Sequence, residues 1–584
     1  MNRAPNVFPS VTGNDRSEMP VQAKGGFTTE SLKLIMPNAK NIVAYLDTPN
    51  CLEVPAGIAL IAPAYGETKE NNLLLSAYLA ANHFYGLRFD WSDHVGESEG
   101  DIFTATLTKM RQVLVSLLDY AQMRFSAQPV GILATSLAAR VAIKLTAQDR
   151  RPAFLVCLTP VVDLRETLTM VYKEDLAGNY SVGKRYGTID ILGFSINADN
   201  FLQDAIENSF VDLASTILDA RTITVPTFFV LGQRDRWVRI ADAESVVGCL
   251  NSPSKAIISL PTALYCLLEN STVVEGAVKE VLKDLIECTD KKKIDLSAIK
   301  VPDLSQVAFR KALEKNHLRE EYEYSQAKER EFWKAYLAKF RHAFNIPDFY
   351  ALLESIHNRL GGAWAGQKVL DAGCGVGNFG IFLLTKQLYR VQQDLQYAKQ
   401  EPLHYYGVDF VWEAISEASG RIAELRNESK SRMGLSGLNS SFINERFVLA
   451  DLEAGLPFPA EFFDHACCNL VISYLQNPAT MFKELWRVLR PGGRVVISSL
   501  KPDADLSEIY RNFISVAEDP SEIEEGRQLL NNAGMIRLKE ASGIYHFSSE
   551  KELTGMARKV GFFKAKTFRS FGNQANLVVC YKAF

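Results

Sequence analysis

The chain has 584 residues, of which 47% are hydrophobic and 23% charged, and its formal net charge is −4. It is too long for one hydrophobic core, because such cores stop growing at about 250–300 residues. The charge balance, without any basic cluster interleaved with aromatic residues, gives no electrostatic basis for binding nucleic acid or an anionic membrane.

Residues 1–29 are predicted to form a flexible tail, and the first 25 of them lack the apolar core of a signal peptide. No apolar run approaches the roughly 20 residues that span a bilayer. The nine cysteines are scattered, without the paired spacing of a zinc site or a disulfide framework. We therefore expect a cytoplasmic protein with no metal site.

Residues 30–290 alternate short apolar runs with helical periodicity, which predicts a doubly wound parallel sheet covered by helices. Within it, a short apolar strand at Val130–Ala134 leads to Ser136, and a helix continues from Arg140. Small residues around a serine at a strand-to-helix turn are what a nucleophile elbow requires. Alanines replace the usual glycines of G-x-S-x-G, so this turn alone is weak evidence.

Four stretches, one of them around Ser136, form a wider pattern: Asp93–Gly96, Thr135–Ala142, Val162–Leu168 and Asp235–Val238. With them, about 290 residues resemble the myristoyl-ACP thioesterases of bacterial luminescence, which are α/β-hydrolases. The resemblance implies that Ser136 is the nucleophile, that Asp235 is the acidic member of a triad, and that the Leu137 amide belongs to an oxyanion hole. It also implies that residues 163–220 form a cap over an acyl pocket.

The histidine of such a triad is missing. The loop after the last predicted strand carries Tyr265 at the expected position, and no histidine lies between His94 and His317. Histidine makes a serine hydroxyl nucleophilic, and losing it costs on the order of a millionfold in turnover. We interpret His94 as structural. The domain is then inactive in hydrolysis and either holds an acyl group or serves as a docking or dimerisation platform.

Residues 291–345 are rich in Lys, Arg and Glu and are predicted to form an exposed helical connector. A second doubly wound domain is predicted over residues 346–584. Its most informative segment is Val369–Asn378, in which a buried strand runs into a glycine-rich turn and then a helix. Such a turn lets the backbone approach a ligand closely, next to the free N–H groups of a helix N-terminus.

Acids and an amide follow at the ends of the next strands, in the order Asp409, Asp451 and Asn469. This order resembles class I S-adenosylmethionine-dependent methyltransferases, with a Rossmann-like fold, over about 230 residues. The resemblance implies roles for eight residues: Asp371, Gly373, Gly375 and Gly377 at the methionine part, Asp409 at the ribose, Asp451 and Leu452 at the adenine, and Asn469 beside the departing methyl group. A Rossmann-like domain for another nucleotide, or a fold that has lost its cofactor, are the alternatives.

One spacing departs from the family pattern, because about thirty residues separate Gly377 from Asp409 instead of roughly twenty. The surplus is polar and is predicted to be a surface excursion. An acceptor hydroxyl or activated carbon would also need a nearby base. His546 is the first candidate for it, followed by His357 and Tyr474, whereas His465 is interpreted as packing.

The leading hypothesis is an S-adenosylmethionine-dependent methyltransferase acting on a small molecule or an acyl chain, in fatty-acyl or specialised metabolism. The thioesterase-like half would recognise the acyl part, and an acyl carrier protein is a candidate partner. A second hypothesis is a bifunctional enzyme that also hydrolyses or transfers an acyl group through Ser136. A non-enzymatic scaffold is the third, and a homodimer is left open.

Overall fold

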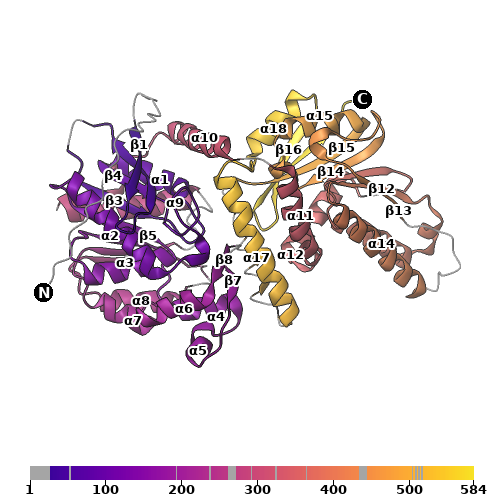
Figure 1. Cartoon of the computed structure of the whole chain (residues 1–584). Helices are drawn as coiled ribbons and strands as arrows, with labels where there is room; N and C mark the ends of the chain where they lie inside the picture. The colour runs from indigo at the N-terminus through magenta and orange to yellow at the C-terminus, as the bar shows by residue number, and fades with distance from the viewer. Residues whose placement is uncertain are drawn as a thin grey trace. The chain divides into compact units, whose positions relative to one another are not determined.

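The computed structural model describes residues 26–584, except for residues 52–53, 192–193, 234, 236–237, 261–270, 291–292, 323–324, 363–364, 433–442, 503, 505, 507–508, 511–512, 515–516 and 518. The chain forms two compact units, Met1–Leu318 and Arg319–Phe584, and Figure 1 shows a sheet with helices in each. Among the described residues, no helix is both long enough and apolar enough to cross a membrane.

The first unit is built on one eight-stranded sheet with the order β1-β2-β4-β3-β5-β6-β9-β10. Every pairing from β4 to β10 is parallel, and β2 runs antiparallel to both of its neighbours. The strands are β1 (Phe27–Ile35), β2 (Asn41–Pro49), β3 (Gly57–Ala62), β4 (Phe84–Phe89), β5 (Val130–Thr135), β6 (Leu155–Leu158), β9 (Thr227–Gly232) and β10 (Lys255–Leu260). Strand β1 thus begins within the predicted tail.

Helices cover both faces of this sheet. Because side chains alternate along a strand, Ile58 and Leu60 of β3 join one core cluster, while Ala59 and Ile61 join the other. Helices α2 (Leu107–Arg124), α3 (Leu137–Gln148) and α8 (Ile240–Cys249) pack on the first face, and α1 (Leu73–Ala81) and α9 (Ser271–Asp290) on the second. This arrangement confirms the first predicted α/β domain.

Between β6 and β9 lies the segment predicted to be a cap. It contains α4 (Leu164–Tyr172), α5 (Leu176–Ser181), a hairpin of β7 (Thr188–Ile191) and β8 (Phe194–Asn197), α6 (Ala198–Glu207) and α7 (Leu213–Ala220). Its apolar side chains, such as Phe201 and Leu202, join the same core cluster as α2 and α3.

The stretch predicted to be a connector is divided between the two units. Helix α10 (Leu304–Glu321) belongs mainly to the first, where its Glu314 forms a buried ion pair with Arg88 of β4 at 3.0 Å. Helix α11 (Gln326–Phe340) belongs to the second unit. The polar composition therefore conceals two helices that pack in different domains.

The second unit has a seven-stranded sheet with the order β13-β12-β11-β14-β15-β17-β16, in which only the pairings of β17 are antiparallel. The strands are β11 (Lys368–Ala372), β12 (Leu403–Asp409), β13 (Ile443–Leu449), β14 (Phe463–Asn469), β15 (Leu489–Leu500), β16 (Phe563–Ser570) and β17 (Ala575–Tyr581). Beside α11, the described helices are α12 (Pro347–Leu360), α13 (Asn378–Gln393), α14 (Trp412–Arg432), α15 (Pro478–Val488), α17 (Pro520–Ala541) and α18 (Glu550–Lys559). This sheet confirms the second predicted α/β domain.

The surplus residues between Gly377 and Asp409 are helical. Helix α13 continues to Gln393, and a short 3-10 helix follows at Leu395–Lys399.

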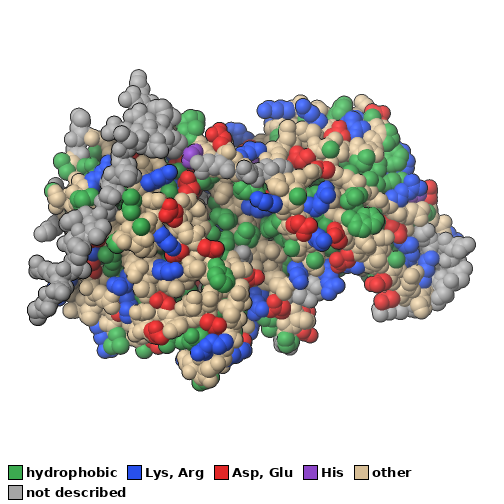
Figure 2. All heavy atoms as spheres, viewed as in Figure 1, with side chains coloured by type: hydrophobic (Ala, Val, Ile, Leu, Met, Phe, Trp, Pro, Cys, Tyr) green, Lys and Arg blue, Asp and Glu red, His purple; other side chains and the backbone are tan. Residues whose placement is uncertain are grey.

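On the face shown in Figure 2, coloured basic and acidic side chains are interspersed, so this face presents no large field of one sign.

Candidate functional site

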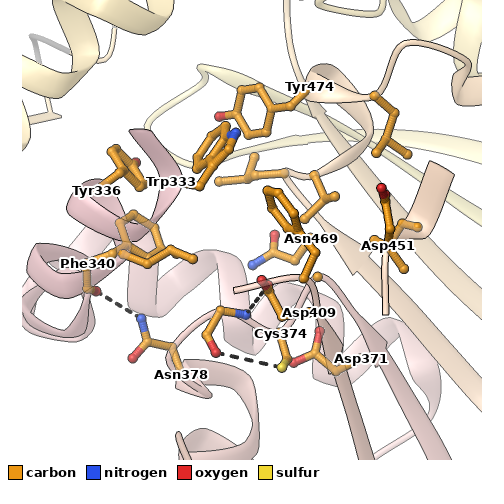
Figure 3. Close-up of a pocket in the computed structure, with 18 of the residues that line it drawn as sticks. Trp333, Tyr336, Phe340, Asp371, Cys374, Asn378, Asp409, Asp451, Asn469 and Tyr474 are labelled. Carbon is orange, nitrogen blue, oxygen red and sulfur yellow. Dashed lines mark hydrogen bonds between the residues drawn. The ribbon is translucent and has the colours of Figure 1, made fainter. Parts of the chain in front are cut away.

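The second unit contains a cavity with about 1170 Å³ of empty space, part of it open to solvent. It lies at the carboxyl ends of β11, β12, β13 and β14, the edge of an open parallel sheet where ligands bind. Figure 3 shows strand-end acids on one side of the cavity and aromatic residues on the other. Seven of the eight predicted cofactor residues line it: Asp371, Gly373, Gly375, Asp409, Asp451, Leu452 and Asn469. Gly377 instead caps the N-terminus of α13.

The glycine turn after β11 needs its glycines. Gly373 has a φ of 80°, and a Cβ there would lie 2.2 Å from Cγ2 of Val471. Gly377 has a φ of 77°, and a Cβ would lie 2.8 Å from the Cβ of Ala418. A side chain at either position would therefore be strained and would clash.

Asp409 ends β12 and ties the strand to the glycine turn. Its Oδ2 accepts the Gly375 N–H at 2.9 Å, and its Oδ1 accepts the Val411 N–H at 3.0 Å. Burial raises the pKa of this carboxyl. Each carboxylate oxygen has a second lone pair, so Asp409 can still accept hydrogen bonds from a ligand.

Asp371, at the end of β11, is buried among its strand neighbours. Its Oδ2 accepts the Tyr405 hydroxyl at 2.6 Å, and its Oδ1 accepts the Cys467 thiol at 3.3 Å. Burial raises the pKa of Asp371 to about 6. The side chain thus braces three strands beneath the cavity.

Asp451 follows β13 and has both oxygens engaged. Its Oδ1 accepts the Glu453 N–H at 2.9 Å, and its Oδ2 accepts the side-chain amide of Gln326. Asn469 ends β14, where its Oδ1 accepts the Ser498 hydroxyl at 2.8 Å. This hydrogen bond fixes the direction of the Asn469 amide at the cavity wall.

Helix α11 supplies the opposite wall, which the sequence interpretation missed. Six of its residues line the cavity: Gln326, Glu329, Trp333, Tyr336, Leu337 and Phe340. Apart from the adjacent Tyr336 and Leu337, successive members are three or four residues apart, which places them on one face of a helix. That periodicity was a usable signal, but the intervening Lys, Arg and Glu residues hid it.

Buried polar contacts anchor α11 over the cavity. The Glu329 carboxylate accepts hydrogen bonds from Lys539 Nζ and the Tyr545 hydroxyl, both at 2.7 Å, and from the Tyr322 hydroxyl at 3.2 Å. At the other end of the helix, the Asn378 amide donates to the Phe340 carbonyl at 3.1 Å. The helix is therefore held at both ends.

In the first unit, Ser136 stands at a sharp turn between β5 and α3. Its φ of 56° and ψ of −121° lie where L-residues are strained, and it is 2% exposed. Its N–H donates to the Leu158 carbonyl at 2.9 Å, and its carbonyl accepts the N–H groups of Ala139 and Val161, both at 3.1 Å. This is the strand–turn–helix setting of a nucleophile elbow.

Comparison with known proteins identifies both halves. Residues 44–323 match the family described as acyl transferase, and residues 340–565 match the one described as methyltransferase domain. The chain joins an acyl-transferase-family domain to a methyltransferase domain. Both parts of the predicted resemblance are thereby confirmed.

Several curated relatives are described as acyl transferases. The one from Photobacterium phosphoreum is 28% identical over 227 residues, which cover 39% of this chain and 74% of that protein. The one from Aliivibrio fischeri is 23% identical over 265 residues, or 45% and 85%. A solved structure of Est1E from Butyrivibrio proteoclasticus with ferulic acid bound is 16% identical, covers 44% of this chain and 99% of its own, and has a TM-score of 0.37.

The predicted base of the methyltransferase domain does not line the cavity. The His546 side chain is 58% exposed, and its Nε2 lies 3.2 Å from Oε1 of Glu552 in α18. His357 is buried against Phe382, and burial lowers its pKa. Tyr474 does line the cavity, but burial raises its pKa, so its hydroxyl stays protonated. The His546 role therefore has no geometric support, because its ring faces a surface glutamate.

The structure describes part of the triad that was predicted for the acyl-transferase domain. Asp235 follows β9, and its Oδ1 accepts the Val238 N–H at 3.3 Å. Leu137 is the first residue of α3. Tyr265 lies outside the described residues. His94 is buried, its Nε2 accepts the Gly66 N–H at 3.4 Å, and burial lowers its pKa to about 3.

Among the described residues, no group of three or more His, Cys, Asp or Glu side chains could hold a metal ion. His465, interpreted as packing, is half-buried at the start of β14, with its Nε2 3.0 Å from Oε1 of Gln367. Burial lowers its pKa to about 4, so the ring is neutral.

Proposed function

We propose that the chain is an S-adenosylmethionine-dependent methyltransferase that acts on a small-molecule or acyl substrate. The observation that carries this proposal is the convergence of the glycine turn, Asp409, Asp451 and Asn469 on one cavity of the methyltransferase domain. The donor set fits the cofactor, because the glycine turn leaves room for backbone approach and Asp409 retains lone pairs for hydroxyl donors.

When bound, the cofactor would supply a methyl group on a positively charged sulfur. The chain's own contribution is to position the acceptor and exclude water. Trp333, Tyr336 and Phe340 from α11 and Tyr474 after β14 give the cavity an apolar wall that suits a flat or aliphatic acceptor. Among the lining residues described, the ionisable side chains other than tyrosine and cysteine are all carboxylates, which match the positive charge of the cofactor.

The acyl-transferase domain would recognise the acyl part of the substrate, with an acyl carrier protein as a partner, or act as a platform. Its family match and the strained serine at the end of β5 support an acyl-handling origin. On this proposal the chain acts in fatty-acyl or specialised metabolism.

Calorimetric titration with S-adenosylmethionine and S-adenosylhomocysteine tests the methyltransferase. We expect micromolar binding to the full chain and its loss in Asp409→Ala, because Asp409 also holds the glycine turn. Glu413→Ala is the matched control, since Glu413 is an exposed acid four residues further along the chain, paired with Lys334 and outside the cavity lining. If the wild-type chain binds neither ligand, the proposal fails and the scaffold hypothesis survives.

A second function, acyl hydrolysis or transfer through Ser136, is favoured by one observation, the elbow geometry of that residue. A fluorophosphonate probe separates the two acyl roles. Rapid labelling that disappears in Ser136→Ala would support a bifunctional enzyme. Slow labelling, equal in both proteins, would support a domain that only recognises an acyl group, as the missing triad histidine predicts.

A further inference from the structure

The carboxylate expected to hold the adenine already has a partner from its own chain. Asp451 accepts the Glu453 N–H through Oδ1 and the Gln326 side-chain amide through Oδ2. Gln326 is the first residue of α11 and its side chain is exposed. Each oxygen of the carboxylate therefore already accepts one hydrogen bond, and the Gln326 side chain lines the same cavity from which a ligand would approach Asp451.

A side-chain amide and the exocyclic amine of adenine offer the same chemistry to a carboxylate. Each is a planar NH₂ group on an sp² carbon, and each donates two hydrogen bonds. The Glu453 N–H belongs to the backbone of the turn after Asp451 and cannot leave without unfolding it. The Gln326 side chain can leave by rotation about its own bonds.

We propose that Gln326 is a residue of the cofactor site that takes the place of the adenine amine at Asp451 and is displaced when the cofactor binds. The proposal rests on the proposed function. Gln326 thereby sets the affinity for the cofactor, because each binding event must first break its hydrogen bond to Asp451. It also keeps the carboxylate partnered when the site is empty of ligand.

The displacement concerns one side chain and leaves the helix in place. Glu329, one turn further along α11, is buried and accepts hydrogen bonds from Lys539 and Tyr545. Near the other end, Leu337 lies against the glycine turn, with its Cδ2 3.0 Å from the position of a Cβ on Gly375. These contacts fix α11 across the site, and the cavity already lies beneath it.

Calorimetric titration of the full chain with S-adenosylhomocysteine tests this role. We expect Gln326→Ala to bind about fivefold more tightly than wild type, the size expected when one solvent-exposed hydrogen bond no longer competes. Lys334→Ala is the matched control. It removes another exposed α11 contact, the 2.8 Å ion pair with Glu413, without freeing Asp451.

A second ligand isolates the adenine amine. The 6-deamino analogue of S-adenosylhomocysteine carries a hydrogen in its place and has no donor for Asp451 at this position, so Gln326→Ala should bind it no more tightly than wild type does. Hydrogen exchange of the α11 amides should be the same in wild type and Gln326→Ala, since the helix keeps its anchors.

The outcomes separate the two proposals. If wild type and Gln326→Ala both fail to bind S-adenosylhomocysteine, the proposed function fails and this inference falls with it. If wild type binds and Gln326→Ala binds equally well, the function stands and Gln326 does not compete. An equal gain in Lys334→Ala, or an equal gain for the 6-deamino analogue, would assign the effect to a loosened helix and overturn the inference.

Discussion

The two domains place their candidate sites alike and build them differently. In the acyl-transferase domain Ser136 follows β5, and in the methyltransferase domain Asp409 and Asp451 stand at the ends of β12 and β13, so both sites use the carboxyl edge of a parallel sheet. In the first site, the geometry described above is that of a single residue, Ser136. In the second site, residues at the ends of four strands and residues of α11 together line the cavity.

Because the two sites are built differently, their geometry supports a function to different degrees. Backbone hydrogen bonds join Ser136 to the main chain of Leu158, Ala139 and Val161, so they hold the elbow whether or not a base activates the hydroxyl. In the methyltransferase domain, the Asp409 carboxylate itself holds the glycine turn. Site and fold are coupled in the second domain, and its geometry is the stronger evidence for activity.

The substitution Glu314→Ala has the largest expected effect on stability. It tests the comparison in the acyl-transferase domain. Arg88 is fully buried and pairs with Asp47 at 2.7 Å and with Glu314 at 3.0 Å. Removing Glu314 leaves part of the buried charge uncompensated, so the free energy of unfolding of the acyl-transferase domain should fall by about 3 kcal/mol.

Hydrogen exchange of β4 peptides in urea measures this loss. Peptides of β11 and β12 should exchange as in wild type, because α10 packs mainly in the first unit. Glu320→Ala is the control, since Glu320 is an exposed glutamate of the same helix. Faster exchange in both domains would show that α10 stabilises the chain as a whole.

The next largest expected effect is a pH-dependent loss of stability that is due to Asp371 and confined to the methyltransferase domain. Burial raises its pKa from 3.8 to about 6, so the folded state holds this proton more tightly than the unfolded chain. The associated stability is fully present below pH of about 4 and is lost as the pH rises to about 6, by about 3 kcal/mol. Asp371→Asn removes this titration.

The measurement is the difference in unfolding free energy between wild type and Asp371→Asn, from exchange of β11 peptides at several pH values. Wild type should lose stability relative to the variant between pH of about 4 and about 6. Asparagine adds a cost of its own facing Tyr405 and Cys467, but that cost is constant with pH. Parallel curves for the two proteins would contradict the raised pKa.

The elements that are buried on both faces could be predicted from the sequence. Strands such as Val130–Thr135 read as continuous apolar runs, and the glycine turn after β11 has a spacing that few other structures require. For the same reason seven of the eight predicted cofactor residues meet at one cavity. The carboxyl ends of parallel strands converge wherever the sheet forms.

Contacts between distant segments could not be predicted in this way. Trp333, Tyr336 and Phe340 follow a helical stripe, but nothing in the stripe says which cavity it covers. The direction of the His546 ring depends on Glu552 in the next helix. The Gln326 contact with Asp451 joins residues 125 positions apart and involves an ordinary polar side chain.

The smallest expected effect concerns the strain at Ser136 and sharpens the comparison most directly. A non-glycine residue at φ 56° and ψ −121° costs of order 1–3 kcal/mol. Ser136→Gly removes the hydroxyl and the strain, whereas Ser136→Ala removes the hydroxyl alone. We expect the glycine variant to be more stable than the alanine variant by about 1 kcal/mol, after the greater flexibility of glycine in the unfolded chain is counted. Hydrogen exchange of β5 peptides in the two variants measures the difference. If the alanine variant is as stable as the glycine variant, the turn stores no strain. The conformation of Ser136 is then no evidence that the domain descends from an enzyme.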